Sequence, residues 1–412
     1  MSNNLLHGIS LVMSEFLRSD ISNVDDYVAD RGPTRFFHGR KRVLGNFGKL
    51  VKESMEAQGG STFLIQGAPG AGKTALLEEM ALDALKNQWD VVDINLDDLY
   101  NPVHMAQTLG KSYVTRKQTG TKVDARVLAR EHVKEVAGDS SVAQVLENMR
   151  PKHGVVLILD EAQRIGRFSD TPNEIPAMGT LDTLHNGKLP HPVILLAAGL
   201  GTTSKSFGSL GISRFKGGCF VELGALGKDA ERAVIRDWLM KEGGAKGDLA
   251  PWIDAIVQNT HGWPHHIISY VYPASEHLKA GDGIMTSEGL HAVLEAGRKG
   301  RKAYYNERSY GFPEEERQGL AEAFADISSG ESMTRKAILS SLARDFEPDE
   351  AKDLFRRAWE KGLLDERGGR YVIPIPSMQD WLISNYGRER ISFPKAPQTS
   401  PALRERNSGL ER

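Results

Sequence analysis

The chain contains one complete G-x-x-x-x-G-K-T motif, which reads Gly67-Ala68-Pro69-Gly70-Ala71-Gly72-Lys73-Thr74. A short apolar run, 62–66, precedes the motif, and the residues after it, 74–82, are rich in helix formers. A strand, a glycine-rich loop and a helix in this order are the context that identifies a phosphate-binding P-loop. The motif therefore predicts an α/β fold with a parallel sheet, in which this loop follows a buried strand.

The residue types of the motif explain why it binds phosphate. Glycines let several backbone N–H groups turn toward one anion, and the helix that follows adds its positive N-terminal end. In such a loop Lys73 reaches the β- and γ-phosphates, and the hydroxyl of Thr74 binds Mg²⁺. We therefore predict nucleotide contacts along 67–74 and a metal ligand at Thr74. A chance glycine-rich turn is the alternative, and both flanking segments argue against it.

A second motif follows the apolar run 155–159, where the chain continues Asp160-Glu161. Parallel sheets place ligands at the carboxyl ends of their strands, so the two acids are expected near the P-loop. Asp160 would hold Mg²⁺ through water, and Glu161 would orient and polarise the attacking water. The alternative is a strand that simply ends in solvated acids. Beside a complete P-loop, the pair predicts a Walker B motif.

The composition is that of a globular protein with more than one domain. The 412 residues are 40% hydrophobic and 26% charged, with a net charge of −2, so any nucleic-acid binding needs a local basic patch. Cys219 is the only cysteine, which excludes an intrachain disulfide and a multi-cysteine zinc site. We find neither a secretory signal nor an apolar run near the roughly 20 residues that span a bilayer. A cytoplasmic protein without a membrane partner is expected.

The segment before the P-loop resembles the start of AAA+ and STAND-type ATPases, a group that includes origin-recognition ATPases and transposition regulators. It reads Phe36-Phe37-His38-Gly39-Arg40 and is followed by an expected helix, 43–55. In those families the Gly-Arg step lies beside the adenine. The resemblance implies that Gly39 and Arg40 contribute to an adenine site. A surface arginine without such a role is the alternative.

The resemblance extends to three later positions. In AAA+ proteins the strand expected at 192–199 ends in a polar sensor, but here it ends in Ala-Ala-Gly, and Thr202 is the candidate substitute. Arg214 is similar to the arginine finger that reaches the γ-phosphate of a neighbouring subunit, which implies a homo-oligomer; pairing with a local acid is the alternative. The step Gly262-Trp263-Pro264-His265-His266 resembles the lid of these ATPases. It implies nucleotide contacts at Pro264 and His265, with histidine where arginine is usual.

The remaining pattern predicts a sheet core followed by helices. Further strands are expected at 89–96 and 218–223, mainly helix at 97–149, and later helices at 230–240, 249–257, 287–308, 313–327, 334–342 and 348–363. A Gly-Gly hairpin at 364–373 follows three helices, which is typical of a winged helix. The predicted divisions are an N-terminal helical segment, 1–34, an ATP-binding core, 35–226, a helical lid with a linker helix, 227–308, a winged-helix domain, 309–386, and a disordered tail, 387–412.

These observations predict an ATP hydrolase that uses Mg²⁺ and couples its nucleotide state, ATP or ADP, to assembly and to partner binding. Mixed charge on the helix 348–363 leaves double-stranded DNA and a protein as alternative partners. A non-catalytic, nucleotide-dependent switch or DNA-binding regulator is the alternative function. A small-molecule kinase is disfavoured, because no acceptor site is evident in the sequence.

Overall fold

The computed structural model describes residues 36–56, 59–100, 151–168, 174–187, 189–325 and 327–387. The helices expected in 1–34, the elements expected between 101 and 149, and the tail from 388 lie outside the described residues. Among the helices in the described ranges, none is both long and apolar enough to cross a membrane.

A five-stranded sheet with the order β2-β3-β4-β1-β5 forms the centre of the molecule. Its strands, all paired in parallel, are β1 (Gly60–Gly67), β2 (Asp90–Asp93), β3 (Val155–Leu159), β4 (Val193–Gly199) and β5 (Phe220–Leu223). Gln66 lies opposite Gly199, so β1 and β4 end at the same edge. The predicted parallel sheet is confirmed. The second strand is shorter than expected, because Leu96 already begins the helix α5 (Leu96–Tyr100).

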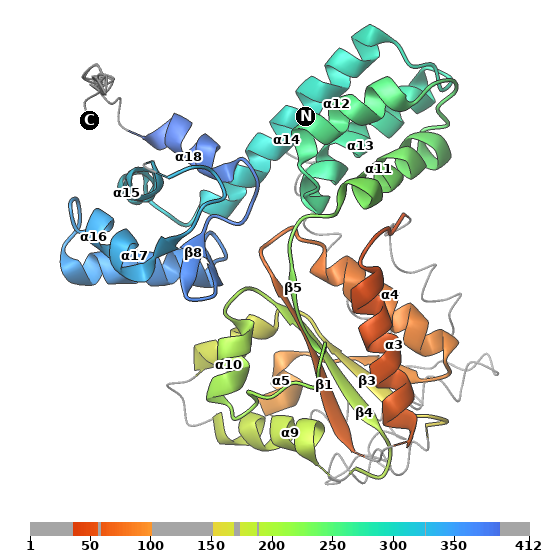
Figure 1. Cartoon of the computed structure of the whole chain (residues 1–412), viewed down its shortest axis with the longest axis vertical. Helices are drawn as coiled ribbons and strands as arrows, with labels where there is room; N and C mark the ends of the chain where they lie inside the picture. The colour runs from red at the N-terminus through yellow and green to blue at the C-terminus, as the bar shows by residue number, and fades with distance from the viewer. Residues whose placement is uncertain are drawn as a thin grey trace, which may run out of the picture.

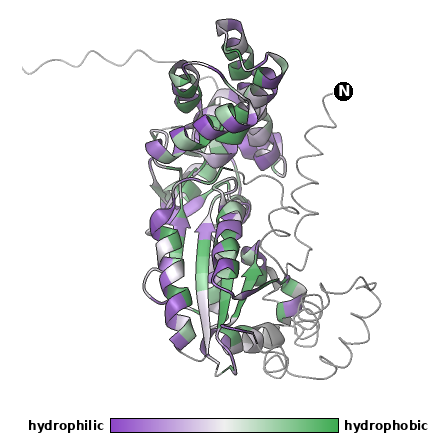
Figure 2. Cartoon of the chain, turned by 90° about the vertical axis from the view of Figure 1, so that its right-hand side faces the viewer, coloured by the Kyte–Doolittle hydropathy of each residue, from purple (hydrophilic) through white to green (hydrophobic). Residues whose placement is uncertain are grey.

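Helices cover both faces of the sheet (Figure 1). The helices α3 (Lys41–Glu56) and α4 (Lys73–Lys86) pack against Phe63 and Ile65 on one face. On the other face, Leu64 packs with α5, the 3-10 helix η1 (Ala162–Phe168), α9 (Glu174–Asn186) and α10 (Thr203–Ser209). Because both faces are covered, the strands β3 and β4 consist of buried, mostly apolar residues, and Figure 2 shows much of the middle of the sheet as hydrophobic.

The lid is helical, as predicted. It consists of α11 (Lys228–Asp237), a π-helical turn η2 (Trp238–Glu242), α12 (Ala250–Thr260), α13 (Pro264–Ala280) and α14 (Ser287–Ser309). Trp238, Ile253 and Tyr270 belong to its own buried cluster. The long helix α14 continues from the lid toward the C-terminal helices (Figure 1).

The C-terminal unit, residues 313–387, combines helices with a small antiparallel sheet. Its elements are α15 (Glu314–Phe324), β6 (Met333–Thr334), α16 (Arg335–Leu342), α17 (Pro348–Glu360), β7 (Asp365–Arg367), β8 (Arg370–Val372) and α18 (Met378–Tyr386), with strand order β6-β8-β7. The predicted hairpin is present, and its turn residues Gly368 and Gly369 have φ values of 58° and 77°, which favour glycine. The strand β6 and the helix α18 were not predicted.

One hydrophobic cluster joins the sheet core to the C-terminal unit. It includes Ile65 on β1, Trp263 before α13 and Tyr304 on α14, and it continues to Phe355 on α17 and Tyr371 on β8. The C-terminal unit therefore packs on the same assembly of side chains as the P-loop, and its hairpin lies close to the ends of the central strands.

Candidate nucleotide site

The P-loop joins β1 to α4 and depends on glycine. Gly70 and Gly72 have φ values of 73° and 85°, in the left-handed region that side chains disfavour. A Cβ atom at Gly70 would lie 2.7 Å from the hydroxyl of Tyr304 and 2.8 Å from the Cβ of His265. Gly70 is therefore required by its backbone conformation and by the lid, which packs directly on the loop.

Lys73 is folded back over the loop. Its Nζ donates hydrogen bonds to the carbonyl oxygens of Gly67 at 3.0 Å and Ala68 at 3.1 Å, and the residue is only 8% exposed. Burial lowers the pKa of Lys73, while Asp160 and Glu161 raise it. Both of these hydrogen-bond partners are neutral carbonyls, so the ammonium charge remains available to an anion at this position.

Asp160 and Thr74 lie side by side at the ends of β3 and the P-loop. The Thr74 hydroxyl donates to Oδ2 of Asp160 at 2.7 Å, and the Glu161 backbone N–H donates to Oδ1 at 2.8 Å. Burial raises the pKa of Asp160, whereas the Thr74 hydrogen bond lowers it. Mg²⁺ prefers hard oxygen ligands such as these, usually one or two from protein with the rest from phosphate and water. The pair therefore fits a Mg²⁺ site.

Glu161 is held in place by Gln163, a residue to which sequence analysis gave no role. The Gln163 amide donates to Oε2 of Glu161 at 2.5 Å, and its Oε1 accepts from the Leu200 N–H at 3.0 Å. A Cβ atom at Gly199 would lie 2.6 Å from that Oε1, so Gly199 leaves room for the glutamine. The strand ends in Gly199 where AAA+ proteins usually carry a polar sensor, and this missing side chain is the sequence signal that could have pointed to Gln163.

The lid brings His265 to the P-loop. The backbone N–H of His265 donates to the carbonyl of Gly70 at 3.2 Å, and its ring stacks on Tyr304 with centroids 3.8 Å apart. The Tyr304 hydroxyl donates to the carbonyl of Pro69 at 2.7 Å. Burial lowers the pKa of His265 to about 4, so its ring is neutral near pH 7 and cannot supply the positive charge of an arginine.

The other two lid positions are also located. His266 is fully buried with its ring edge-on to Tyr304 and Tyr305, and burial lowers its pKa to about 3. Pro264 approaches the end of the loop, where a Cβ atom at Gly72 would lie 3.5 Å from its Cγ. Pro264 and His265 therefore line the loop, and their contact with a nucleotide stays a prediction.

Gly39 and Arg40 lie at the junction of core and lid. Both have positive φ, 85° and 57°, and a Cβ atom at Gly39 would lie 2.9 Å from the Cβ of Ala230 on α11. The Arg40 guanidinium donates to the carbonyl of Gly224 at 2.5 Å and to that of Ala71 in the P-loop at 3.4 Å. Arg40 thus ties the P-loop to the segment after β5, and its predicted place beside adenine stays a prediction.

Arg214 lies away from the P-loop of its own chain. It is exposed and precedes β5, near Lys216, whose Nζ donates to the Ser61 hydroxyl at the start of β1 at 3.1 Å. Because β1 and β5 are parallel, their starts lie at one end of the sheet and their ends at the other. Arg214 precedes the start of β5, whereas the P-loop follows the end of β1, so the two lie at opposite ends. By contrast, Thr202 follows β4 at the P-loop edge, at the start of α10, and caps no helix N–H with its side chain.

Comparison with known proteins agrees with this geometry. Residues 37–189 match the family model described as an AAA ATPase domain. The predicted resemblance to AAA+ P-loop ATPases is therefore confirmed, and the matched residues include the loop at 67–74. No curated protein matches the chain.

Solved structures of other proteins share the fold, among them the following two. The chain resembles a Walker-type ATPase of Pyrococcus abyssi, with 16% identity, coverage of 82% of this chain and 94% of that chain, and a TM-score of 0.53. It also resembles the ADP form of the ORC2 protein of Aeropyrum pernix, with 13% identity, coverage of 82% and 92%, and a TM-score of 0.50. At these identities the likeness concerns the fold alone.

Proposed function

We propose that the chain binds ATP with Mg²⁺ at the P-loop edge of the sheet and hydrolyses it. The observation that carries this proposal is the 2.7 Å hydrogen bond between Thr74 and Asp160, which brings the two expected metal ligands together beside Lys73. Bound Mg²⁺ would neutralise charge on the phosphates. When ATP is bound, the Lys73 ammonium would contact the β- and γ-phosphates and no longer the carbonyl oxygens of Gly67 and Ala68.

Glu161 is the proposed base of the reaction. Its carboxylate follows Asp160 directly and would orient a water toward the γ-phosphate and accept its proton. The residue has a φ of 54°, which is uncommon outside glycine. The hydrogen bond from Gln163 holds the same carboxylate against the end of β4.

We further propose that hydrolysis depends on a second copy of the chain. Arg214 is exposed at the sheet end opposite to its own P-loop, so a neighbouring subunit would be the one to receive it. There it would stabilise the charge that develops on the transferred phosphate. The proposed homo-oligomer therefore rests on the exposure and position of this arginine.

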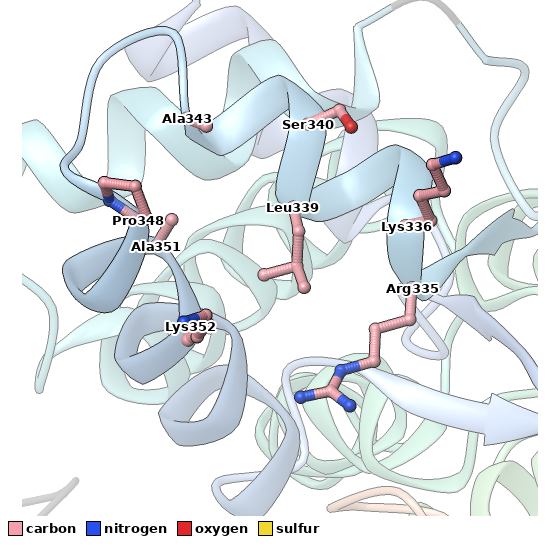
Figure 3. A pocket seen from close by; sticks show the side chains of 8 residues that line it. All are labelled: Arg335, Lys336, Leu339, Ser340, Ala343, Pro348, Ala351 and Lys352. Carbon is pink, nitrogen blue, oxygen red and sulfur yellow. The ribbon is translucent and has the colours of Figure 1, made fainter.

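The C-terminal unit is the proposed contact for a partner. We assign it as a winged-helix domain, 309–386, after the core 35–226 and the lid 227–308. An open groove of about 520 Å³ lies between α16 and α17, with an apolar floor that includes Leu339 and a rim that includes Lys336 (Figure 3). Double-stranded DNA and a protein remain the alternative partners.

The test compares ATP hydrolysis by the wild type and by Glu161→Gln, each with and without duplex DNA. Removal of a general base predicts a loss of about 10²-fold or more in turnover. ATP affinity should be retained, because Lys73, Thr74 and Asp160 are unchanged. A matched control is Glu288→Gln on the lid helix α14, which is exposed and far along the chain from the P-loop. Wild-type protein that binds ATP but never hydrolyses it would refute the enzymatic proposal.

A non-catalytic switch is the second candidate. It is favoured by the neutral ring of His265, since AAA+ lids usually present an arginine there, and by the apolar end of β4. In that case nucleotide would control assembly or partner binding without turnover. Light scattering during size-exclusion chromatography, with ATP and with ADP and with and without duplex DNA, would separate the two functions when it is combined with the hydrolysis assay.

A further inference from the structure

The C-terminal unit lies directly on the P-loop. The turn before β7 contains Gly362 with a φ of 74°, where a Cβ atom would lie 2.8 Å from Cδ of Pro69 and 3.3 Å from Leu200. Beside it, the Lys205 ammonium of α10 lies 4.7 Å from the Trp359 ring centroid. No side chain fits at position 362 without movement, so backbone of the C-terminal unit contacts the loop that receives phosphate.

Because of this contact, a carboxylate of the C-terminal unit lies near the nucleotide site. Asp365, the first residue of β7, has a side chain that is only 12% exposed. A Cβ atom at Gly201 would overlap its Oδ1, so the carboxylate lies against the backbone just beyond the end of β4. Its ion pair with Arg367 is long, at 3.4 Å. The carboxylate therefore approaches the ligand edge of the sheet, where Arg367 and a backbone hydrogen bond from Glu366 partly compensate its burial.

Asp365 also interacts electrostatically with Lys73. Burial raises the pKa of Asp365, while Arg367 and Lys73 lower it; in return, Asp365 is among the acids that raise the pKa of Lys73. The carboxylate and the ammonium therefore attract each other, in agreement with the contacts of Asp365 with Gly201 and of Gly362 with Pro69. A γ-phosphate bound by Lys73 would bring further negative charge into the same space, whereas a nucleoside diphosphate would not.

We propose that Asp365 makes the site discriminate between nucleoside di- and triphosphates. With the hairpin on the P-loop, its carboxylate repels the γ-phosphate and tolerates a diphosphate. Triphosphate binding and the contact between Gly362 and Pro69 therefore oppose each other, and by reciprocity the bound triphosphate weakens that contact. This inference rests on the proposed nucleotide binding but not on hydrolysis.

The test measures the dissociation constants of ADP and of the β,γ-imido analogue of ATP, both with Mg²⁺. Asp365→Asn removes the charge and keeps the shape of the side chain. We expect it to tighten triphosphate binding about tenfold, within the usual range of coupling between sites, and to change ADP binding by less than about twofold. Asp349→Asn is the matched control, because Asp349 is exposed in the same unit and pairs with Lys352.

A second variant moves the hairpin and keeps the charge. In Gly362→Ala the added Cβ meets Pro69 and the residue must hold a positive φ, so the turn must shift away from the loop. We expect the same selective gain for the triphosphate, with far-UV circular dichroism unchanged. Equal shifts for both nucleotides, or none in either variant, would overturn the role of Asp365. A wild type that binds neither nucleotide would instead overturn the proposed function and this inference with it.

Discussion

Two charged regions of the molecule differ in how their charges are compensated. At the P-loop edge, Lys73, Asp160 and Asp365 are largely buried. Burial lowers the pKa of Lys73 and raises the pKa of both aspartates, so it favours the neutral form of each side chain. On α17, Arg356 is exposed and pairs with Asp353 at 2.5 Å and Glu360 at 2.9 Å, each within one helical turn. The first region holds buried charge, whereas the second is neutralised at the surface.

This difference indicates at which of the two regions a charged ligand gains the most binding free energy. Buried charges are costly, and a ligand that supplies the missing counter-charge recovers part of that cost. Exposed pairs such as those of α17 contribute little and leave little net charge for a polyanion to meet. The nucleotide edge should therefore respond strongly to single substitutions, and the exposed face of α17 weakly.

The largest effect is expected for Lys73→Ala. It removes two charge-assisted contacts to phosphate, each worth about 1.5–3 kcal/mol, so ATP affinity should fall by up to about 10⁴-fold. Titration calorimetry with ATP and Mg²⁺ measures this loss. Lys86→Ala, at the exposed end of the same helix α4, is the matched control and should bind ATP as the wild type does. Unchanged affinity in the Lys73 variant would contradict the assignment of the P-loop.

Arg214→Ala should come next. A trans-acting arginine contributes about 10³-fold or more to turnover, so kcat should fall by about that factor while ATP affinity is retained. Steady-state hydrolysis at saturating ATP, at protein concentrations above and below assembly, is the measurement. Arg236→Ala on α11 changes another exposed arginine and serves as control. Equal turnover at saturating ATP would remove Arg214 from the mechanism.

Gln163 offers a sharper test inside the buried region. Gln163→Ala loses both of its hydrogen bonds, whereas Gln163→Glu keeps the acceptor for the Leu200 N–H and loses the donor to Glu161. A hydrogen bond to a charged group is worth about 1.5–3 kcal/mol, so both variants should lower kcat about 10- to 100-fold with little change in KM. If only the alanine variant is impaired, the glutamine supports β4 and does not position Glu161.

The core of the site could be predicted because it is local in sequence. The P-loop from Gly67 to Thr74 carries its strand, turn and helix signals in one continuous segment, and the apolar run before Asp160 has the length and the β-branched residues of a buried strand. The Gly-Gly hairpin was predictable for the same reason. In each case the residue types determine the backbone before any tertiary contact is considered.

The missed features depend on tertiary contacts. The helix α10 has one large apolar residue, Phe207, and its polar sequence shows no helical period. The role of Gln163 follows from the space that Gly199 leaves on another strand. Asp365 looks like an ordinary hairpin residue, and only the packing of Gly362 on Pro69 brings it to the nucleotide edge. None of these tertiary contacts can be predicted from the spacing of residues along the chain.

The smallest effect is expected on α17. Arg356 is already paired with Asp353 and Glu360, so Arg356→Ala should change duplex-DNA affinity by less than about twofold, as expected for a cation with little free charge. Lys336, on the rim of the groove between α16 and α17, forms no ion pair with any residue that the structure describes. Its substitution by alanine should therefore weaken DNA binding more and reduce the salt dependence by about one phosphate contact. Fluorescence anisotropy over a range of salt concentrations compares the two variants, and a larger loss for Arg356→Ala would show that α17 reads DNA despite its internal pairing.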